Sequence, residues 1–314
     1  MPHTIKEIKH VRDALKAIHF DSWLVLDLDN TVMKPRLALG GDAWFEGLFT
    51  HCLQHNIAPT ISQIALLSVY NAVQDFVRTS AVELNIVLII KALQDIGIPV
   101  IGLTARGYSI SQQTIRQLGD MGVDFSQNSI IPDNNSSCQN GIIFCDGKDK
   151  GEKLKEVFTQ LGCTPSHVAM IDDKNKHLER MKLTLDSLKI PFSGFRYSYL
   201  DEEVQQFNME QANVQLTHLW DRLSPAVQKD ILDLKLLPNA PHDIASSSDY
   251  EDSFFQLPHH VPVVTLPPVL DNQSPIQQPK SLVRSQRFFY KKNQDNVIPS
   301  EGVESPPPPS MPLS

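Results

Sequence analysis

The chain has 314 residues and a formal net charge of −8 at pH 7, with 28 Lys and Arg against 36 Asp and Glu. It shows no basic stripe, no long apolar run and no Cys-x-x-Cys pair, so we expect no nucleic-acid binding, no membrane span and reduced cysteines. The segment Met1–Ile18 lacks the apolar stretch of a signal peptide, which predicts a cytoplasmic location.

Prolines are concentrated at the C-terminal end of the chain. Fourteen of the 22 prolines fall in the last 77 residues, from Pro238 to Ser314. A segment this rich in Pro and Ser cannot bury enough apolar surface to form a core, so we predict a disordered tail over 238–314. The remaining residues, ending at Leu237, are enough for one well-buried domain with an insertion.

The N-terminal part predicts a helix, a strand and an insertion, in that order. Apolar residues recur at helical spacing over Ile5–Ile18, whereas Trp23–Asp29 is an apolar run that ends in acidic residues, as in a buried parallel strand. About 70 residues separate this strand from the next, far more than one crossover helix needs. We therefore predict a small helical cap inserted at about 36–82, with helices at Trp44–Phe49 and Ile61–Val77.

After the insertion, apolar strands alternate with helical patterns. Strands are predicted at Ile98–Ala105, His167–Asp173 and Gly194–Tyr199. The helical patterns cover Val82–Gly97, Ser111–Met121, Gly151–Leu161, Asp201–Gln215 and Ser224–Leu237. This alternation predicts an α/β fold with a parallel, helix-flanked sheet, whose core consists of residues 1–35 and 83–237.

Two carboxylates lie two residues apart directly after the first predicted strand, in the segment DLDNT (Asp27–Thr31). Such a pair at the carboxyl edge of a parallel sheet is costly unless a hard cation such as Mg²⁺ compensates it. At the strand end Asp27 can attack phosphorus, and Asp29 in the following turn can act as an acid and then as a base. The alternative is an ordinary β-turn in which Asp and Asn only form the turn.

Polar side chains also follow two other predicted strands. Thr104 can bind a phosphoryl oxygen or can simply cap a helix, and Arg106 can contact phosphate or another substrate anion. Asp172 and Asp173 form a second adjacent acid pair, for which a solvated loop is the alternative. Since the carboxyl ends of parallel strands meet at one edge of a sheet, these groups and the first acid pair are expected to lie together.

The segment GKDKGEKL (Gly147–Leu154) supplies a cation at the start of a predicted helix. Lys150 can balance the charge of the first acid pair and of a phosphoryl group. Lys148 and Lys153 are competing candidates, and any of the three can instead be a surface charge.

Weaker signals lie in the cap and in the tail. Trp44 and Thr31 are candidates for substrate binding, although an aromatic stripe like the one around Trp44 more often forms the core of a cap. In the tail, Ser246–Phe255 mixes acids with aromatic residues, and Pro306–Pro309 is compatible with a polyproline II helix. Each tail segment can be a docking element or a plain solvated linker.

Acid pair, hydroxyl, lysine and acid pair follow one another in the order of the four motifs of the haloacid dehalogenase (HAD)-like superfamily, which the chain resembles over about residues 20–200. More narrowly, the segments GDAWFEGL, VIGLTAR and GIIFCDGKDKGEKL resemble a little-characterised family, DUF2608, of intracellular bacteria such as Legionella, Coxiella and Chlamydia. The superfamily resemblance implies a three-layer α/β/α core with a Rossmann-like parallel sheet.

The resemblance also implies an activity, that of a Mg²⁺-dependent phosphatase. Asp27 would be the nucleophile that forms an aspartyl-phosphate, and Asp29 the general acid and base. Thr104 would bind the phosphoryl group, and Lys150 would stabilise the intermediate. The dehalogenases of the superfamily lack the second acid of the first motif, so Asp29 favours phosphate chemistry over carbon–halogen cleavage.

The resemblance further implies a Mg²⁺ site formed by the Asp27 carboxylate, the Asp29 main-chain carbonyl and Asp172, with Asp173 assisting or replacing one of them. Many superfamily members carry a further acid four or five residues after the first Asp of the last motif. This chain has Lys and His at those positions. The fourth-motif ligand is therefore left open between Asp173 and Asn175.

Two alternatives to a hydrolase follow from the same residues. One is a phosphotransferase, and the other is a bacterial effector or binding protein that keeps the fold with little turnover. The predicted tail and the family resemblance motivate the second, with delivery into a host cell without a cleavable signal peptide and a host protein or the secretion machinery as partner. Asp29 argues against it, because a degenerate enzyme commonly loses this acid. The expected substrate is phosphorylated, but its class is not specified.

Overall fold

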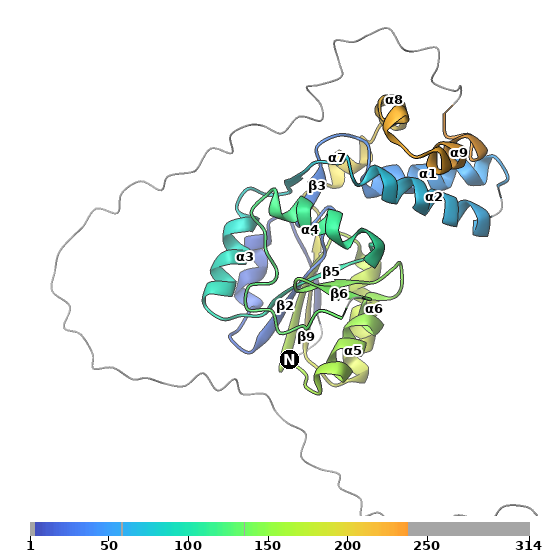
Figure 1. Ribbon diagram of the computed structural model, residues 1–314. Helices are drawn as coiled ribbons and strands as arrows, with labels where there is room; N and C mark the ends of the chain where they lie inside the picture. The colour runs from blue at the N-terminus through green and yellow to red at the C-terminus, as the bar shows by residue number, and fades with distance from the viewer. Residues whose placement is uncertain (1–3, 58, 135, 238–314) are drawn as a thin grey trace, which may run out of the picture.

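The computed structural model describes residues 4–57, 59–134 and 136–237, with the side chains of 59–62 excepted, so the predicted tail lies outside the described residues. The described chain is a mixed α/β protein in which helices cover both faces of a mostly parallel central sheet (Figure 1). A second group of helices forms a layer beyond one edge of the sheet (Figure 1). The predicted α/β class is confirmed.

The central sheet has seven strands in the order β1-β9-β8-β2-β5-β7-β6. Neighbouring strands are parallel except β6 and β7, which are antiparallel. In this order the strands are β1 (Thr4–Ile8), β9 (Phe192–Tyr197), β8 (His167–Asp172), β2 (Ser22–Leu26), β5 (Val100–Thr104), β7 (Ile142–Phe144) and β6 (Cys138–Gln139).

The central strand β2 lies where the strand order reverses. All residues of β2, β5 and β8 are buried, which explains why these strands are continuous apolar runs in the sequence. Leu24 of β2 pairs with Val100 of β5 on one side and with Ala169 of β8 on the other. In open α/β sheets ligands bind outside the carboxyl ends of strands at such a switch point, and Asp27 follows β2 there.

Helices cover the two faces of this sheet. Alternate residues of β2 point to opposite faces, with Leu24 and Leu26 in one hydrophobic cluster and Trp23 and Val25 in the other. The first cluster includes residues of η1 (Val11–Ala17), α3 (Ile86–Asp95) and α4 (Ser111–Gly119), and η2 (Tyr108–Ile110) leads into α4. The second includes residues of α5 (Lys150–Leu161) and α6 (Asn175–Ser187).

A separate hydrophobic cluster holds the helical layer together. Its helices are α1 (Asp42–Gln54), α2 (Pro59–Val73), α8 (Met209–His218), η3 (Trp220–Arg222) and α9 (Pro225–Asp233). The short helix α7 (Asp201–Gln205) precedes α8. The layer is thus larger than the predicted insertion, because residues up to Leu237, predicted to belong to the core domain, pack with it.

The predicted N-terminal helix is wrong. Thr4–Ile8 is the edge strand β1, which pairs with β9, and only the following Val11–Ala17 is helical, as a 3₁₀ helix. Helical spacing arose because Ile8 of the strand and Val11 of the helix are buried in the same cluster. Pairing with β9 outweighs the local helical pattern, since tertiary context overrides a weak propensity.

Some elements were not predicted, and one predicted helix is interrupted. The short strands β3 (Met33–Pro35) and β4 (Thr79–Ala81) form an antiparallel pair at the two ends of the insertion. The helix predicted over Asp201–Gln215 is divided into α7 and α8. Within the described part of the chain, no helix is long and apolar enough to cross a membrane.

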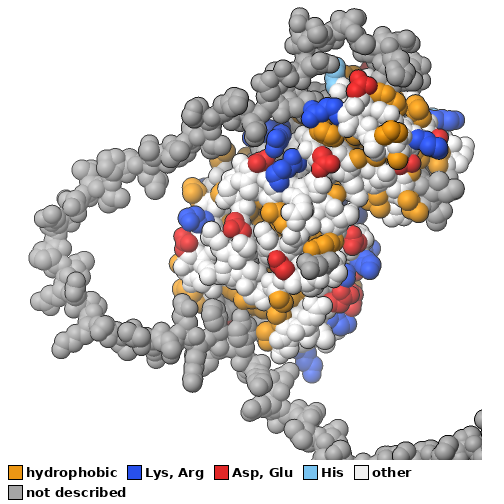
Figure 2. Space-filling view, viewed as in Figure 1, with side chains coloured by type: hydrophobic (Ala, Val, Ile, Leu, Met, Phe, Trp, Pro, Cys, Tyr) orange, Lys and Arg blue, Asp and Glu red, His pale blue; other side chains and the backbone are white. Residues whose placement is uncertain are grey.

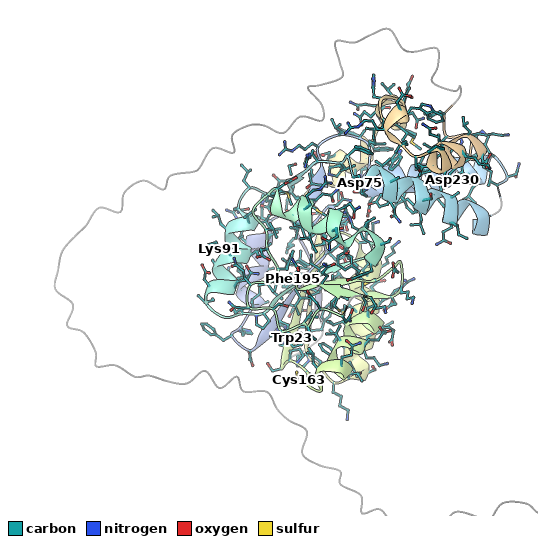
Figure 3. All side chains as sticks on the ribbon, viewed as in Figure 1. Trp23, Asp75, Lys91, Cys163, Phe195 and Asp230 are labelled. Atoms are coloured by element: carbon teal, nitrogen blue, oxygen red, sulfur yellow. The ribbon has the colours of Figure 1, made fainter. Side chains whose placement is uncertain are left out.

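Hydrogen bonds join the helical layer to the sheet body. Asp75, at the junction in Figure 3, accepts a hydrogen bond from Gln113 Nε2 at 2.8 Å through its carboxylate and one from Arg116 at 2.9 Å through its carbonyl. Asp230 lies on the far helices of the layer, whereas Phe195 lies in the sheet (Figure 3). The junction between the two bodies is therefore polar, and a cavity opens beside it.

Candidate active site

The turn after β2 brings two buried carboxylates to the carboxyl edge of the sheet. Asn30 has a left-handed backbone conformation (φ 59°), which Asn tolerates better than most residues, and its amide donates to the Met33 carbonyl at 2.9 Å. Asp27 and Asp29, on the N-terminal side of this turn, are only 5% and 9% exposed. The DLDNT segment therefore forms a tight turn and also positions two buried acidic side chains.

Lys150 is the lysine that meets these acids. It is the first residue of α5, which Asp149 caps by accepting a hydrogen bond from the Glu152 amide. Its ammonium donates to Asp27 Oδ1 at 2.5 Å and to Asp172 Oδ2 at 2.7 Å, and the residue is 3% exposed. The competing Lys148 and Lys153 do not make these contacts, since Lys148 is exposed and Lys153 pairs with Glu156. The structure thus places Lys150 in the predicted position.

Three carboxylates lie close together here, and Lys150 bonds two of them, Asp27 and Asp172. Oxygen atoms of Asp27, Asp172 and Asp173 all lie within 4.8 Å of one another. Burial raises the pKa of Asp27 well above its usual value; Lys150 opposes this rise, and the carboxylates of Asp172 and Asp173 add to it. Burial alone would raise the pKa of Asp172, but Lys150 and the His177 imidazole hold this pKa below its usual value. When all three carboxylates are ionised, they carry more negative charge than one lysine balances.

Asp173 supplies an oxygen that suits a cation. Its Oδ1 atom is buried and accepts no hydrogen bond from the described residues, while Oδ2 accepts a long bond from Asn30 Nδ2 at 3.4 Å. Asn175, the alternative ligand, instead donates to Glu179 at 2.7 Å. Three closely spaced carboxylates with an unpartnered oxygen are the donors that Mg²⁺ prefers, so the residues fit this ion.

Asp173 gives the metal-free protein a predicted pH dependence. Burial, with the carboxylates of Asp172 and Asp42 nearby, raises the pKa of Asp173 to about 7, against an ordinary value of about 3.9. Between these values the folded chain holds one proton more than the unfolded chain, so Asp173 makes folding less favourable as pH rises from about 4 to about 7.

In urea denaturation with EDTA, Asp173→Asn should therefore gain stability relative to wild type as pH rises through this window. Above a pH of about 7.5 the difference should stay constant. A difference between the two proteins that does not change from pH about 4 to about 7 would contradict the assignment.

Arg106, predicted to contact a substrate anion, is held by side chains of the protein itself. Its guanidinium donates from Nε and Nη2 to the two oxygens of Asp29, both at 2.8 Å, and from Nη1 to Thr114 and Gln117 of α4. Its own amide donates to Thr104 Oγ1 at 3.1 Å. Both oxygens of Asp29 are thus engaged, and Arg106 positions this acid.

The two hydrogen bonds from Arg106 to Asp29, called the Arg106 fork below, give a second prediction. Arg106→Lys keeps the charge but loses the planar pair of donors, so we expect the free energy of unfolding to fall by about 1–3 kcal/mol. Arg180→Lys is the matched control, because this arginine is 61% exposed and its 3.9 Å contact with Asp149 is loose. It should change stability by at most about 0.5 kcal/mol. Equal losses in urea denaturation would show that the fork is unimportant.

A cavity of about 350 Å³ lies between this edge of the sheet and the helical layer. Asp27, Asp29 and Arg106 line it from the sheet side. From the helical layer it is lined by Asp42, Phe45, Gln63, Leu67, Tyr70 and Asn71. The predicted nucleophile and the predicted acid therefore face one open cavity beneath the helices.

Three other predicted site residues are buried outside this lining. Thr104 and Thr31 are fully buried, and the Thr31 hydroxyl has no hydrogen-bond partner among the described residues. Trp44 is also fully buried and stacks on Tyr70 in the core of the helical layer. Its neighbour Phe45 lines the cavity instead. The alternative interpretation of Trp44, as core of the cap, agrees with this placement.

Sequence reasoning missed the ionic contact that joins the two walls of this cavity. Lys174, directly after the second acid pair, donates to Asp42 at 2.7 Å and to Glu46 at 3.1 Å, both on α1. His177, also on the lining, contacts the Asp172 carboxylate at 3.2 Å. The only sequence signal for Lys174 is its position directly after the acid pair, because no local pattern indicates that it pairs with α1.

Comparison with known proteins identifies relatives of this chain. It is 22% identical over 200 residues to a Chlamydia pneumoniae protein named "Putative outer membrane protein", covering 61% of this chain and 76% of that protein. A protein of the same name from Chlamydia trachomatis serovar D is 21% identical over 199 residues, covering 62% and 76%. The sequence profile of the family described as "Protein of unknown function (DUF2608)" matches residues 4–229, from β1 into α9. The chain therefore belongs to the DUF2608 family.

Proposed function

We propose that the chain is a HAD-like, Mg²⁺-dependent phosphatase that forms an aspartyl-phosphate on Asp27. The observation that carries this proposal is the buried cluster of Asp27, Lys150, Asp172 and Asp173 at the switch point of a parallel sheet, with Asp27 facing a cavity. Phosphoryl transfer requires mainly positioning and charge neutralisation, and this arrangement offers both.

The reaction has two steps in this site. Lys150 bonds Oδ1 of Asp27, so Oδ2 is assigned the attack on phosphorus, and the ester oxygen departs with a proton supplied by Asp29. The phosphoryl group is then on Asp27. Asp29 takes a proton from water, whose oxygen attacks the phosphorus and releases inorganic phosphate, regenerating the Asp27 carboxylate.

The surrounding residues support these steps. Mg²⁺ held by Asp27, Asp172 and Asp173 would neutralise phosphate charge and orient the phosphoryl group. Lys150 keeps the nucleophile's carboxylate in place, and the buried Thr104 hydroxyl at the adjacent strand end accepts a hydrogen bond from the Arg106 amide. Arg106 must release one oxygen of Asp29 before that oxygen can carry a proton.

The proposal is tested by phosphate release from a broad panel of phosphomonoesters. We expect release with Mg²⁺ present, complete loss after treatment with EDTA, and recovery when excess Mg²⁺ is added back. Protein that binds Mg²⁺ but releases no phosphate from any member of the panel would contradict the proposal. Transfer of the phosphoryl group to an added alcohol in preference to water would instead identify a phosphotransferase.

One observation favours a second candidate, a binding or effector protein with little turnover. Both oxygens of Asp29 accept hydrogen bonds from Arg106, which withholds the acid from the reaction in this arrangement. We expect such a protein to bind phosphate analogues in the presence of Mg²⁺. Its rate of ester hydrolysis should not increase in the Arg106→Lys variant. A phosphatase held back only by this contact would become faster in that variant.

Location is a separate proposal. The names of the chlamydial relatives refer to the outer membrane, whereas we propose a cytoplasmic protein or one delivered into a host cell. A translocation reporter fused to the full chain and to a chain ending at Leu237 tests delivery. Equal delivery of the two fusions would exclude a role for the C-terminal segment.

A further inference from the structure

The cavity has an apolar wall opposite its acidic one. Phe45, Leu67 and Tyr70 line it from the helical layer, and the Phe45 and Tyr70 rings meet edge to face with centroids 5.3 Å apart. Leu67 is 42% exposed, although it lies beside a cluster of charges. Figure 2 shows hydrophobic side chains on the surface of the helical layer. Apolar and aromatic side chains that line a pocket are the groups against which an apolar part of a ligand packs.

The cations on this lining are already bound to carboxylates. Arg106 is held by Asp29, and Lys174 is held by Asp42 and by a second acid of α1. Asp146 adds a further carboxylate at the cavity. A second anionic group on a substrate would therefore lie among carboxylates and would have to displace an existing ion pair, which is unfavourable.

We infer that the ester cleaved in this cavity has an uncharged, apolar leaving group of about the size of a phenyl ring. This inference rests on the proposed phosphatase function. The scissile phosphate lies at Asp27, and the leaving group packs on Phe45, Leu67 and Tyr70. The volume of about 350 Å³ is near the lower end of the range of about 300–1,000 Å³ for small-molecule pockets, so it suits a small ester.

A neighbouring opening has the opposite character and supplies the competing outcome. It shares six lining residues with the cavity, Phe45 and Lys174 among them, and is also lined by Lys148, Lys176 and Arg180. These residues lie toward the start of α5 and α6, outside the apolar wall, where positive charge steers a phosphate dianion toward the site. If they instead hold a second phosphate, bisphosphate substrates will be preferred.

The test compares three esters that share one aromatic ring: phenyl phosphate, 4-carboxyphenyl phosphate and 1,4-phenylene bisphosphate. In full-length protein with Mg²⁺, we expect kcat/KM for phenyl phosphate to exceed that of each of the others by on the order of tenfold. The para carboxylate makes the phenolate a slightly better leaving group, so intrinsic reactivity works against the expected preference. Calorimetric titration with benzylphosphonate and 4-carboxybenzylphosphonate should show the same order of affinity.

A variant with an added cation makes the test specific to the apolar wall. Leu67→Arg should reduce the preference for phenyl over 4-carboxyphenyl phosphate by about tenfold, because it supplies a partner for the carboxylate. Leu53→Arg is the matched control, since Leu53 is 48% exposed on α1 and does not line the cavity. It should leave the preference unchanged.

The outcomes separate the two proposals. Turnover without preference, or a preference for the carboxylate or the bisphosphate, would overturn the inference and leave the phosphatase proposal standing. An equal effect of Leu67→Arg and Leu53→Arg would also overturn it. If none of the three esters is hydrolysed while other members of the broad panel are, only the inference is overturned. If no member of the panel is hydrolysed, both are overturned.

Discussion

Asp27→Asn should abolish phosphate release, with a fall in kcat of at least about 10³-fold, because the neutral amide cannot form the aspartyl-phosphate. The same change should leave the fold intact or slightly more stable. Burial raises the pKa of Asp27 and neighbouring carboxylates add to the shift, so a neutral side chain relieves repulsion in the folded state. The measurements are steady-state phosphate release and urea denaturation of the same protein.

Asp95→Asn is the matched control for this change. Asp95 is exposed at the end of α3, which leads into the opposite, amino-terminal end of β5. The control should keep full activity and stability within about 0.5 kcal/mol of wild type. Residual turnover of Asp27→Asn close to that of Asp95→Asn would exclude Asp27 as the nucleophile.

Lys150→Met should cause the largest loss of stability among the site variants, about 3–5 kcal/mol in the free energy of unfolding. The lysine is 3% exposed and bonds two buried carboxylates, so its removal leaves both without their cation. Because a divalent cation can replace part of this charge, added Mg²⁺ should recover more stability in Lys150→Met than in wild type. Thermal denaturation with and without Mg²⁺ measures the difference.

Lys153→Met provides the comparison on the same helix. Its ammonium pairs with Glu156, whose side chain is 55% exposed, and such pairs contribute about 0–1 kcal/mol. We expect a loss within that range and no added effect of Mg²⁺. If both lysine variants lose the same stability, the buried acid cluster is not balanced by Lys150.

The sequence was sufficient to predict the sheet strands that carry the site. Runs such as Val100–Thr104 and His167–Asp172 are apolar throughout because both sheet faces are covered, and their polar ends mark the carboxyl edge. The segment Thr4–Ile8 was not predictable in this way. It is a half-exposed edge strand whose pairing partner, β9, lies almost 190 residues later in the chain.

The grouping of acids around Lys150 was predictable, but the hydrogen bonds from Arg106 to both oxygens of Asp29 were not. Parallel topology alone places Asp27 and Asp172 at the ends of adjacent strands. The Arg106 fork instead depends on the orientation of α4, where Thr114 and Gln117 hold the guanidinium. That orientation follows from the packing of a helix on the sheet, which no local pattern encodes.

The helical layer is assembled from two segments that are far apart in the chain, and this sets an order of events during synthesis. The sheet is complete once β9 has emerged, at Tyr197, but α2 gains its packing partner α9 only with residues 225–233. Until then the apolar face of α2, including Leu66 and Val69, lacks its cover from α9. All residues of the acidic cluster are therefore synthesised before α9, and the helical layer over the cavity is the last part of the described chain to be completed.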